Sequence, residues 1–95
     1  MILAWAKISM RIPGMKSLKD KRRIIKSLKD SIFAKFKISI SEVDENDIWQ
    51  RATLGLAIVS SDRSYAQKSL DMILQLISQN TSLEIIHRDF QIIKI

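Results

Sequence analysis

Five cationic side chains near the start of a helix-like segment form the part of the sequence best suited to binding an anion. Lys19, Arg22, Arg23 and Lys26 recur at intervals of three and four residues, and Lys16 stands just upstream. At about 100° per residue, such side chains share one arc of a helix. The free N–H groups and partial positive charge of a helix N-terminus add to their attraction for an anion. We call these five residues the basic arc and predict that they contact phosphate groups.

A solvated helix face fits the same residues equally well. Asp20 and Asp30 stand close enough in sequence to pair locally with some of the cations, and exposed pairs of this kind are common. Charge alone indicates association rather than a particular site. Both interpretations therefore stay open at the level of sequence.

The residue types that most enzymes use are sparse. There is no cysteine, and His87 is the one histidine, so neither a thiolate site nor a histidine pair can hold a metal. Glu42, Asp44, Glu45 and Asp47 are more typical of a polar hairpin turn than of a Mg²⁺ site. Two glycines leave no phosphate-binding loop, and no serine stands in a nucleophile elbow. We therefore expect no enzyme activity, no catalytic residue, no metal and no cofactor.

The periodicity of apolar residues predicts six elements that position the basic arc. Strands are expected at residues 2–12, 37–43, 48–60 and 83–95, and helices at 17–36 and 62–79. Ser17 is the expected N-cap of the first helix, and Ile24 and Phe33 are expected to widen its apolar stripe. The order β-α-β-β-α-β predicts a single α+β domain over residues 1–95. Its expected fold is ferredoxin-like, a four-stranded antiparallel sheet with two helices on one face.

Two details at the C-terminal end of the chain follow from residue type. We expect Asn80 to end the second helix in left-handed geometry. The adjacent apolar pairs Ile85-Ile86 and Ile92-Ile93 break the alternation of the last strand. Either a bulge intervenes there or both faces of the strand are covered, the second implying a partner.

The side of the sheet away from the helices offers two kinds of contact. Domains of this topology bind RNA by stacking bases on aromatic residues of the first and third strands, but here only Trp5 is available and the motif of such domains is absent. Arg11 and Arg51 extend the cationic surface predicted to bind RNA. An apolar sheet face on a small domain more often means association, and we expect a homodimer interface formed by Leu3, Trp5, Ala57 and Val59.

The net charge of +6 is unevenly distributed along the chain. Residues 1–37 hold eleven of the sixteen Lys and Arg residues but only two of the ten acidic residues. This asymmetry indicates a nucleic-acid or acidic-protein partner, or self-association of opposite patches. The apolar run Met1 to Ala6 is too short to span a bilayer and has no basic region ahead of it. We expect a cytoplasmic protein with no membrane partner.

Two longer segments carry a resemblance to a known family. They are RIPGMKSLKDKRRIIKSL (residues 11–28) and SEVDENDIWQRATLGLAIVSSD (residues 41–62), and Asp20 stands where many relatives have glutamate. The chain resembles the bacterial YlxP-like family of small proteins of unknown function over nearly its whole length. The resemblance implies a ferredoxin-like fold and no established catalytic residue. Because genes of the family often lie beside those for translation initiation factor two and a ribosome-binding factor, it also implies a role near ribosome assembly or translation.

Three hypotheses about function follow. The first is a non-enzymatic RNA- or ribosome-binding module whose contacts are Arg11, Lys16, Lys19, Arg22, Arg23, Lys26 and Arg51. The second is a homodimeric protein-interaction or structural module that does not bind nucleic acid. The third, an enzyme or small-ligand regulatory domain, has only the fold in its favour. Trp49 either anchors the hairpin to the sheet or contacts a partner.

Overall fold

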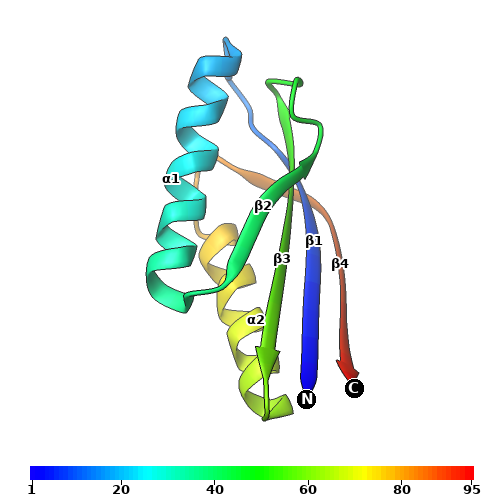
Figure 1. Ribbon diagram of the computed structural model, residues 1–95. Helices are drawn as coiled ribbons and strands as arrows, with labels where there is room; N and C mark the ends of the chain where they lie inside the picture. The colour runs from blue at the N-terminus through cyan, green and yellow to red at the C-terminus, as the bar shows by residue number, and fades with distance from the viewer.

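The computed structural model describes all 95 residues as one four-stranded sheet covered by two helices. The elements in chain order are β1 (Ile2–Arg11), α1 (Leu18–Phe36), β2 (Ser39–Asp44), β3 (Arg51–Ser60), α2 (Arg63–Ser78) and β4 (Glu84–Lys94). The sheet is antiparallel with strand order β2-β3-β1-β4, and both helices lie on the same side of it (Figure 1). The predicted ferredoxin-like α+β fold is confirmed. The uncovered side of the sheet is called the open face below.

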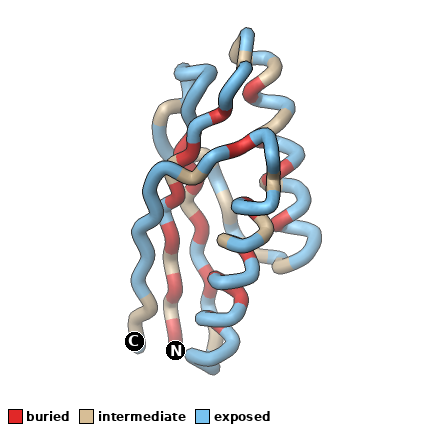
Figure 2. Tube along the Cα trace, turned by 180° about the vertical axis from the view of Figure 1, so that it is seen from behind, coloured by how far each residue is buried: buried red, intermediate tan, exposed pale blue.

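The core lies between the two helices and the central strands. β1 and β3 pair along their whole length, from Ile2 opposite Ser60 to Arg11 opposite Arg51. Alternate residues of these strands point toward the helices and are buried, as Figure 2 shows along β1. The helices complete the core with Ile25, Leu28 and Ile32 of α1 and with Ala66, Leu70, Ile73 and Ile77 of α2.

The ends of α1 are fixed by local backbone contacts. The N–H of Asp20 donates to the Ser17 hydroxyl at 3.1 Å, which confirms the predicted N-cap. At the other end Lys37 adopts left-handed geometry with φ 55°, and its N–H donates to the Phe33 carbonyl at 2.8 Å. Phe33 itself is 55% exposed, so the expectation that it widens the buried stripe was wrong. It lies beside the edge strand β2, where no further strand covers it.

The turn between β2 and β3 is longer than its sequence indicated. The N–H of Ile48 donates to the Glu45 carbonyl at 3.1 Å, and β3 begins only at Arg51. Glu45 has a positive φ of 61°, which reverses the chain there. Trp49 therefore belongs to the turn and not to the strand predicted over residues 48–60.

The end of α2 also departs from expectation. The helix stops at Ser78, and Gln79 keeps right-handed geometry while its N–H donates back to Gln75. Asn80 has no positive φ. Its side-chain oxygen instead accepts from the N–H of Ser82 at 2.9 Å, which fixes the following turn without a left-handed residue.

A bulge explains the pair Ile85-Ile86 of β4, whereas at Ile92-Ile93 the strand alternates regularly and Ile93 lies opposite Leu3 on the open face. The register with β1 shifts between Ser9 and Met10, so Ile85 faces Met10 and Ile92 faces Ala4, both toward the helices. β4 is an edge strand, and most of its residues are exposed (Figure 2). Neither helix is long and apolar enough to cross a membrane.

Candidate nucleic-acid interface

The basic arc lies on the outer surface of α1 and of the turn before it. All five of its side chains are exposed. Lys26 pairs with Asp30 one turn later, with 2.7 Å between Nζ and Oδ2. The other four cations form no salt bridge, so their charges are not neutralised within the chain. The arrangement leaves a row of free cations on one helix face.

The basic arc borders the edge of the sheet at β2. Arg22, Lys26, Lys29 and Phe33 follow one another at helical spacing. A shallow hollow of about 360 Å³ lies between α1 and β2 and is lined by Lys29, Asp30, Phe33, Ile38, Ser39 and Ile40. This side of α1 therefore faces outward past β2 rather than toward α2. A ligand on the basic arc has direct access to the β2 edge.

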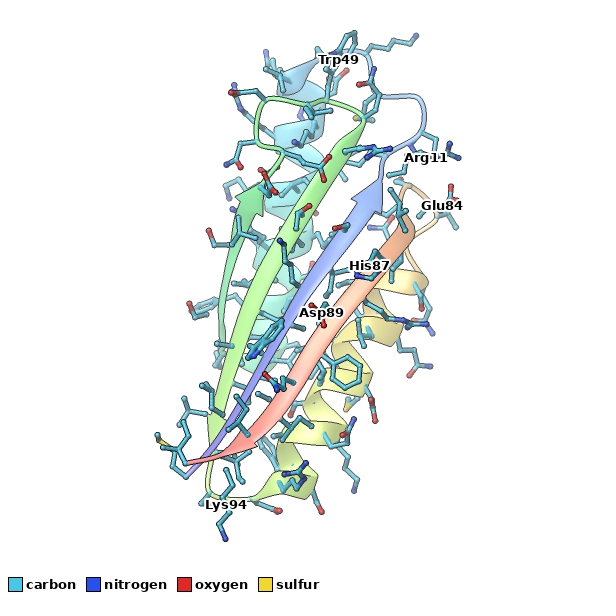
Figure 3. All side chains as sticks on the ribbon, turned by 90° about the vertical axis from the view of Figure 1, so that its right-hand side faces the viewer. Arg11, Trp49, Glu84, His87, Asp89 and Lys94 are labelled. Atoms are coloured by element: carbon cyan, nitrogen blue, oxygen red, sulfur yellow. The ribbon has the colours of Figure 1, made fainter.

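Arg11 and Arg51 lie on the other side of the sheet. They face each other in the register, Arg11 as the last residue of β1 and Arg51 as the first residue of β3. Both project from the open face. Arg11 pairs with Glu84 at 2.8 Å between Nη2 and Oε2, and both are seen at the same end of the sheet in Figure 3. Arg51 Nη1 lies 3.9 Å from Glu45 Oε2. The seven predicted RNA contacts thus form two groups, separated by the sheet.

Lys21 is a buried charged residue that the predictions from sequence did not include. It is completely buried, and its Nζ lies 2.8 Å from Glu42 Oε2, an ion pair whose geometry is not that of a well-directed hydrogen bond. The same Nζ donates to the carbonyls of Glu45 at 2.6 Å and Asn46 at 3.4 Å. Its spacing indicates this burial, because the buried stripe of the helix runs through Leu18, Lys21, Ile25 and Leu28. Lys21 joins the start of α1 to the β2–β3 turn.

Glu45 fastens the same turn on the open face. Its Oε1 accepts from Thr53 Oγ1 at 2.9 Å, and Ser9 Oγ lies 3.3 Å from Thr53 Oγ1. Its N–H donates to Asp44 Oδ1 at 2.8 Å. Two of the four acidic residues of this region are therefore engaged by side chains of the chain itself. No group of three or more His, Cys, Asp or Glu side chains is placed to hold a metal ion.

The apolar residues predicted for a dimer interface do come together. Leu3 faces Val59 and Trp5 faces Ala57 across the central strand pair, and all four project from the open face. Val59 is 66% exposed. They form an apolar patch at the end of the sheet remote from Arg11 and Arg51.

The two remaining residues of interest stand apart from both surfaces. Trp49 is 40% exposed in the β2–β3 turn, at the far end of the molecule in Figure 3. His87 is exposed on the open face, opposite Ser9 in the register. Neither has a hydrogen-bonded side-chain partner.

Comparison with known proteins places the chain in a family. Residues 3–90 match the family described as "Protein of unknown function (DUF503)". The chain is also 40% identical over 68 residues to "Uncharacterized protein YlxP" of Bacillus subtilis (strain 168), which covers 72% of this chain and 74% of that protein. The resemblance found in the sequence is confirmed, and the chain belongs to this YlxP-like family of proteins of unknown function.

Proposed function

We propose that this protein is a non-enzymatic, ribosome-associated RNA-binding protein that contacts phosphates through the basic arc. The observation that carries the proposal is the set of four exposed cations, Lys16, Lys19, Arg22 and Arg23, that have no carboxylate partner. A row of such cations on one helix attracts a polyanion and releases its bound counterions.

The positions of the acidic residues support the proposal. Glu42 is paired beneath α1 with Lys21, and Glu45 is turned to the open face by Thr53. Neither carboxylate is available to neutralise the basic arc. Of the acidic residues on α1, only Asp30 pairs with one of its cations.

The test is the binding of a structured ribosomal RNA fragment by fluorescence anisotropy, with Arg22→Ala/Arg23→Ala as the variant. A matched control is Arg63→Ala/Lys68→Ala, which removes two exposed, unpaired cations from α2. The control and the first variant therefore have the same net charge. We expect the first variant to lose about tenfold in affinity, because two phosphate contacts disappear. The control should lose far less. Equal losses would show that only net charge matters, and would contradict a site on α1.

Homodimerisation through the open face is a second candidate function. The apolar patch of Leu3, Trp5, Ala57 and Val59 favours it, because exposed apolar surface on a small domain stabilises association. Sedimentation velocity over a range of concentrations should then show a monomer–dimer equilibrium. Val59→Asp should shift that equilibrium to monomer, because association would bury an unpaired charge. A wild-type protein that stays monomeric at micromolar concentration would contradict this candidate.

A further inference from the structure

We propose that a hollow on the open face binds one unpaired base of a single-stranded RNA, stacked against Trp5. The inference rests on the proposed RNA-binding function and deepens it, because it states which conformation of RNA is recognised. It assigns a role to a surface that is distinct from the basic arc.

The hollow lies over β2, β3 and β1. Its volume is about 410 Å³, toward the lower end of the range of about 300–1,000 Å³ that small-molecule sites occupy. Its lining includes Trp5, Lys7, Ser39, Ser41, Gly55 and Ala57. It is open to solvent along the sheet, as a site for part of a longer ligand must be.

Small residues of β3 create the space. Gly55 stands opposite Lys7 and Ser41 in the register and has no side chain of its own, which leaves room for the side chain of Val43. A Cβ on Gly55 would lie 2.8 Å from Cγ1 of Val43, which means that Val43 leans over the glycine and forms one wall. Ala57, opposite Trp5, is too small to cover the indole, which remains partly exposed.

The chemistry of the lining fits a base with its attached phosphate. The indole of Trp5 offers a surface for stacking, and the hydroxyls of Ser39 and Ser41 can donate to or accept from the edge of a base. Lys7 is the only charged residue in the lining. It faces Asp89 in the register but forms no salt bridge with it, so its ammonium is free for a phosphate (Figure 3 labels Asp89).

Only the edge strand β2 separates the hollow from α1. Ser39 lines both this hollow and the one formed by Lys29 and Phe33 on the helix side of β2. β2 is a six-residue edge strand, so nothing beyond it blocks the way. One RNA strand that leaves the hollow over Ser39 reaches α1 at Lys29, one turn from Lys26 and beside the carboxylate of Asp30, which pairs with Lys26.

The charges on the open face favour RNA over a second copy of the chain as the occupant. A second copy seated on the hollow would desolvate Lys7 and its register partner Asp89, which form no salt bridge with each other. The centres of protein interfaces are depleted of charged residues, and burying unpaired charges is costly. An RNA strand instead supplies phosphate to Lys7 and a flat ring to Trp5.

The test compares a single-stranded RNA of mixed sequence with the blunt duplex that it forms with its complement. In a Trp49→Phe background, Trp5 is the only indole, so its fluorescence reports on the hollow. We expect saturable quenching by the single strand and none by the duplex, whose bases are already stacked. Ala57→Leu, which fills the space beside Trp5, should weaken single-strand binding roughly fivefold to a hundredfold, the value of one stacked base. It should leave duplex binding unchanged.

Matched variants separate this inference from the proposed function. Val59→Leu adds bulk to the same face of β3 outside the hollow and should leave both affinities unchanged. Arg22→Ala/Arg23→Ala should weaken the binding of both the single strand and the duplex. If Ala57→Leu does not fold, Trp5→Ala replaces it from a partly exposed position, and the affinities for the two RNAs are then measured by anisotropy of labelled RNA, because this variant lacks the reporting indole.

The possible outcomes distinguish the hollow from the basic arc. If Trp5 is not quenched, and Ala57→Leu binds single-stranded RNA as tightly as Val59→Leu does, the proposed base site in the hollow is contradicted, while RNA binding by the basic arc is not. If Trp5 is quenched and Arg22→Ala/Arg23→Ala does not weaken that binding, the base site in the hollow is supported and phosphate binding by the basic arc is contradicted. No binding of either RNA would contradict both. A concentration-dependent change in Trp5 emission without RNA, abolished by Ala57→Leu, would identify a second copy as the occupant.

Discussion

Lys21 places an amino group where water does not reach it. Its Nζ donates hydrogen bonds to the backbone carbonyls of Glu45 and Asn46 and forms an ion pair with Glu42. The ammonium therefore holds the β2–β3 turn against the first turns of α1. We infer that its role is structural.

Replacing Lys21 by methionine tests this role. Methionine keeps most of the apolar volume but leaves the carboxylate of Glu42 and two carbonyls without their donor. We expect Lys21→Met to lower the free energy of unfolding by about 3–5 kcal/mol, the usual cost of breaking a buried pair from one side. Urea unfolding measures this loss. The double variant Lys21→Met/Glu42→Gln should recover part of it, and wild-type stability in the single variant would contradict the role.

At the scale of single residues, the sequence predicted charge and exposure well and pairing poorly. The alternation of β1 and β3 already placed Arg11 and Arg51 on the open face, but grouping them with the basic arc ignored the sheet between them. Lys21 has the spacing of a buried residue but the charge typical of an exposed one, so its burial is not evident from residue type. Only the approach of the β2–β3 turn to α1, a long-range contact, supplies its partners.

At the scale of elements, the strands differ in how well their backbones are protected. β1 pairs on both sides along its length, whereas β2 is a short edge strand with a bulge near Val43. Period and capping residues predicted each element and the Ser17 cap. They did not predict the extent of the β2–β3 turn, where Glu45 has a positive φ and is contacted by Lys21 and Thr53, both of which are distant from it in sequence.

Hydrogen exchange of backbone amides should reflect this difference. We expect the amides of β1 and the central part of β3 to exchange slowest, near the limit set by global unfolding. Those of β2 should exchange by local opening, because one of its edges is free. Exchange in β2 as slow as in β1 would show that the β2 edge is covered in solution. That outcome would also contradict the proposed passage of RNA over Ser39.

At the scale of the whole molecule, the fold sorts the charges of the chain onto different surfaces. Free cations lie on α1, an apolar patch lies at one end of the open face, and Arg11, Arg51 and Glu84 occupy the other end. The order of elements predicted the sheet topology and the shared side of the helices, because few connections satisfy right-handed crossovers. The hollow around Gly55 needed the register of three strands and the position of Val43, which no local pattern contains.

The most direct test of phosphate binding by the basic arc is the salt dependence of single-stranded RNA binding. It is measured for the wild-type protein and for Arg22→Ala/Arg23→Ala. Five phosphate contacts predict a slope of about −3 to −4 for log K against log salt concentration, at about 0.7 per contact for a single strand. The variant should flatten that slope by about one to two units. A shallow wild-type slope, or one that the variant leaves unchanged, would contradict phosphate binding by α1.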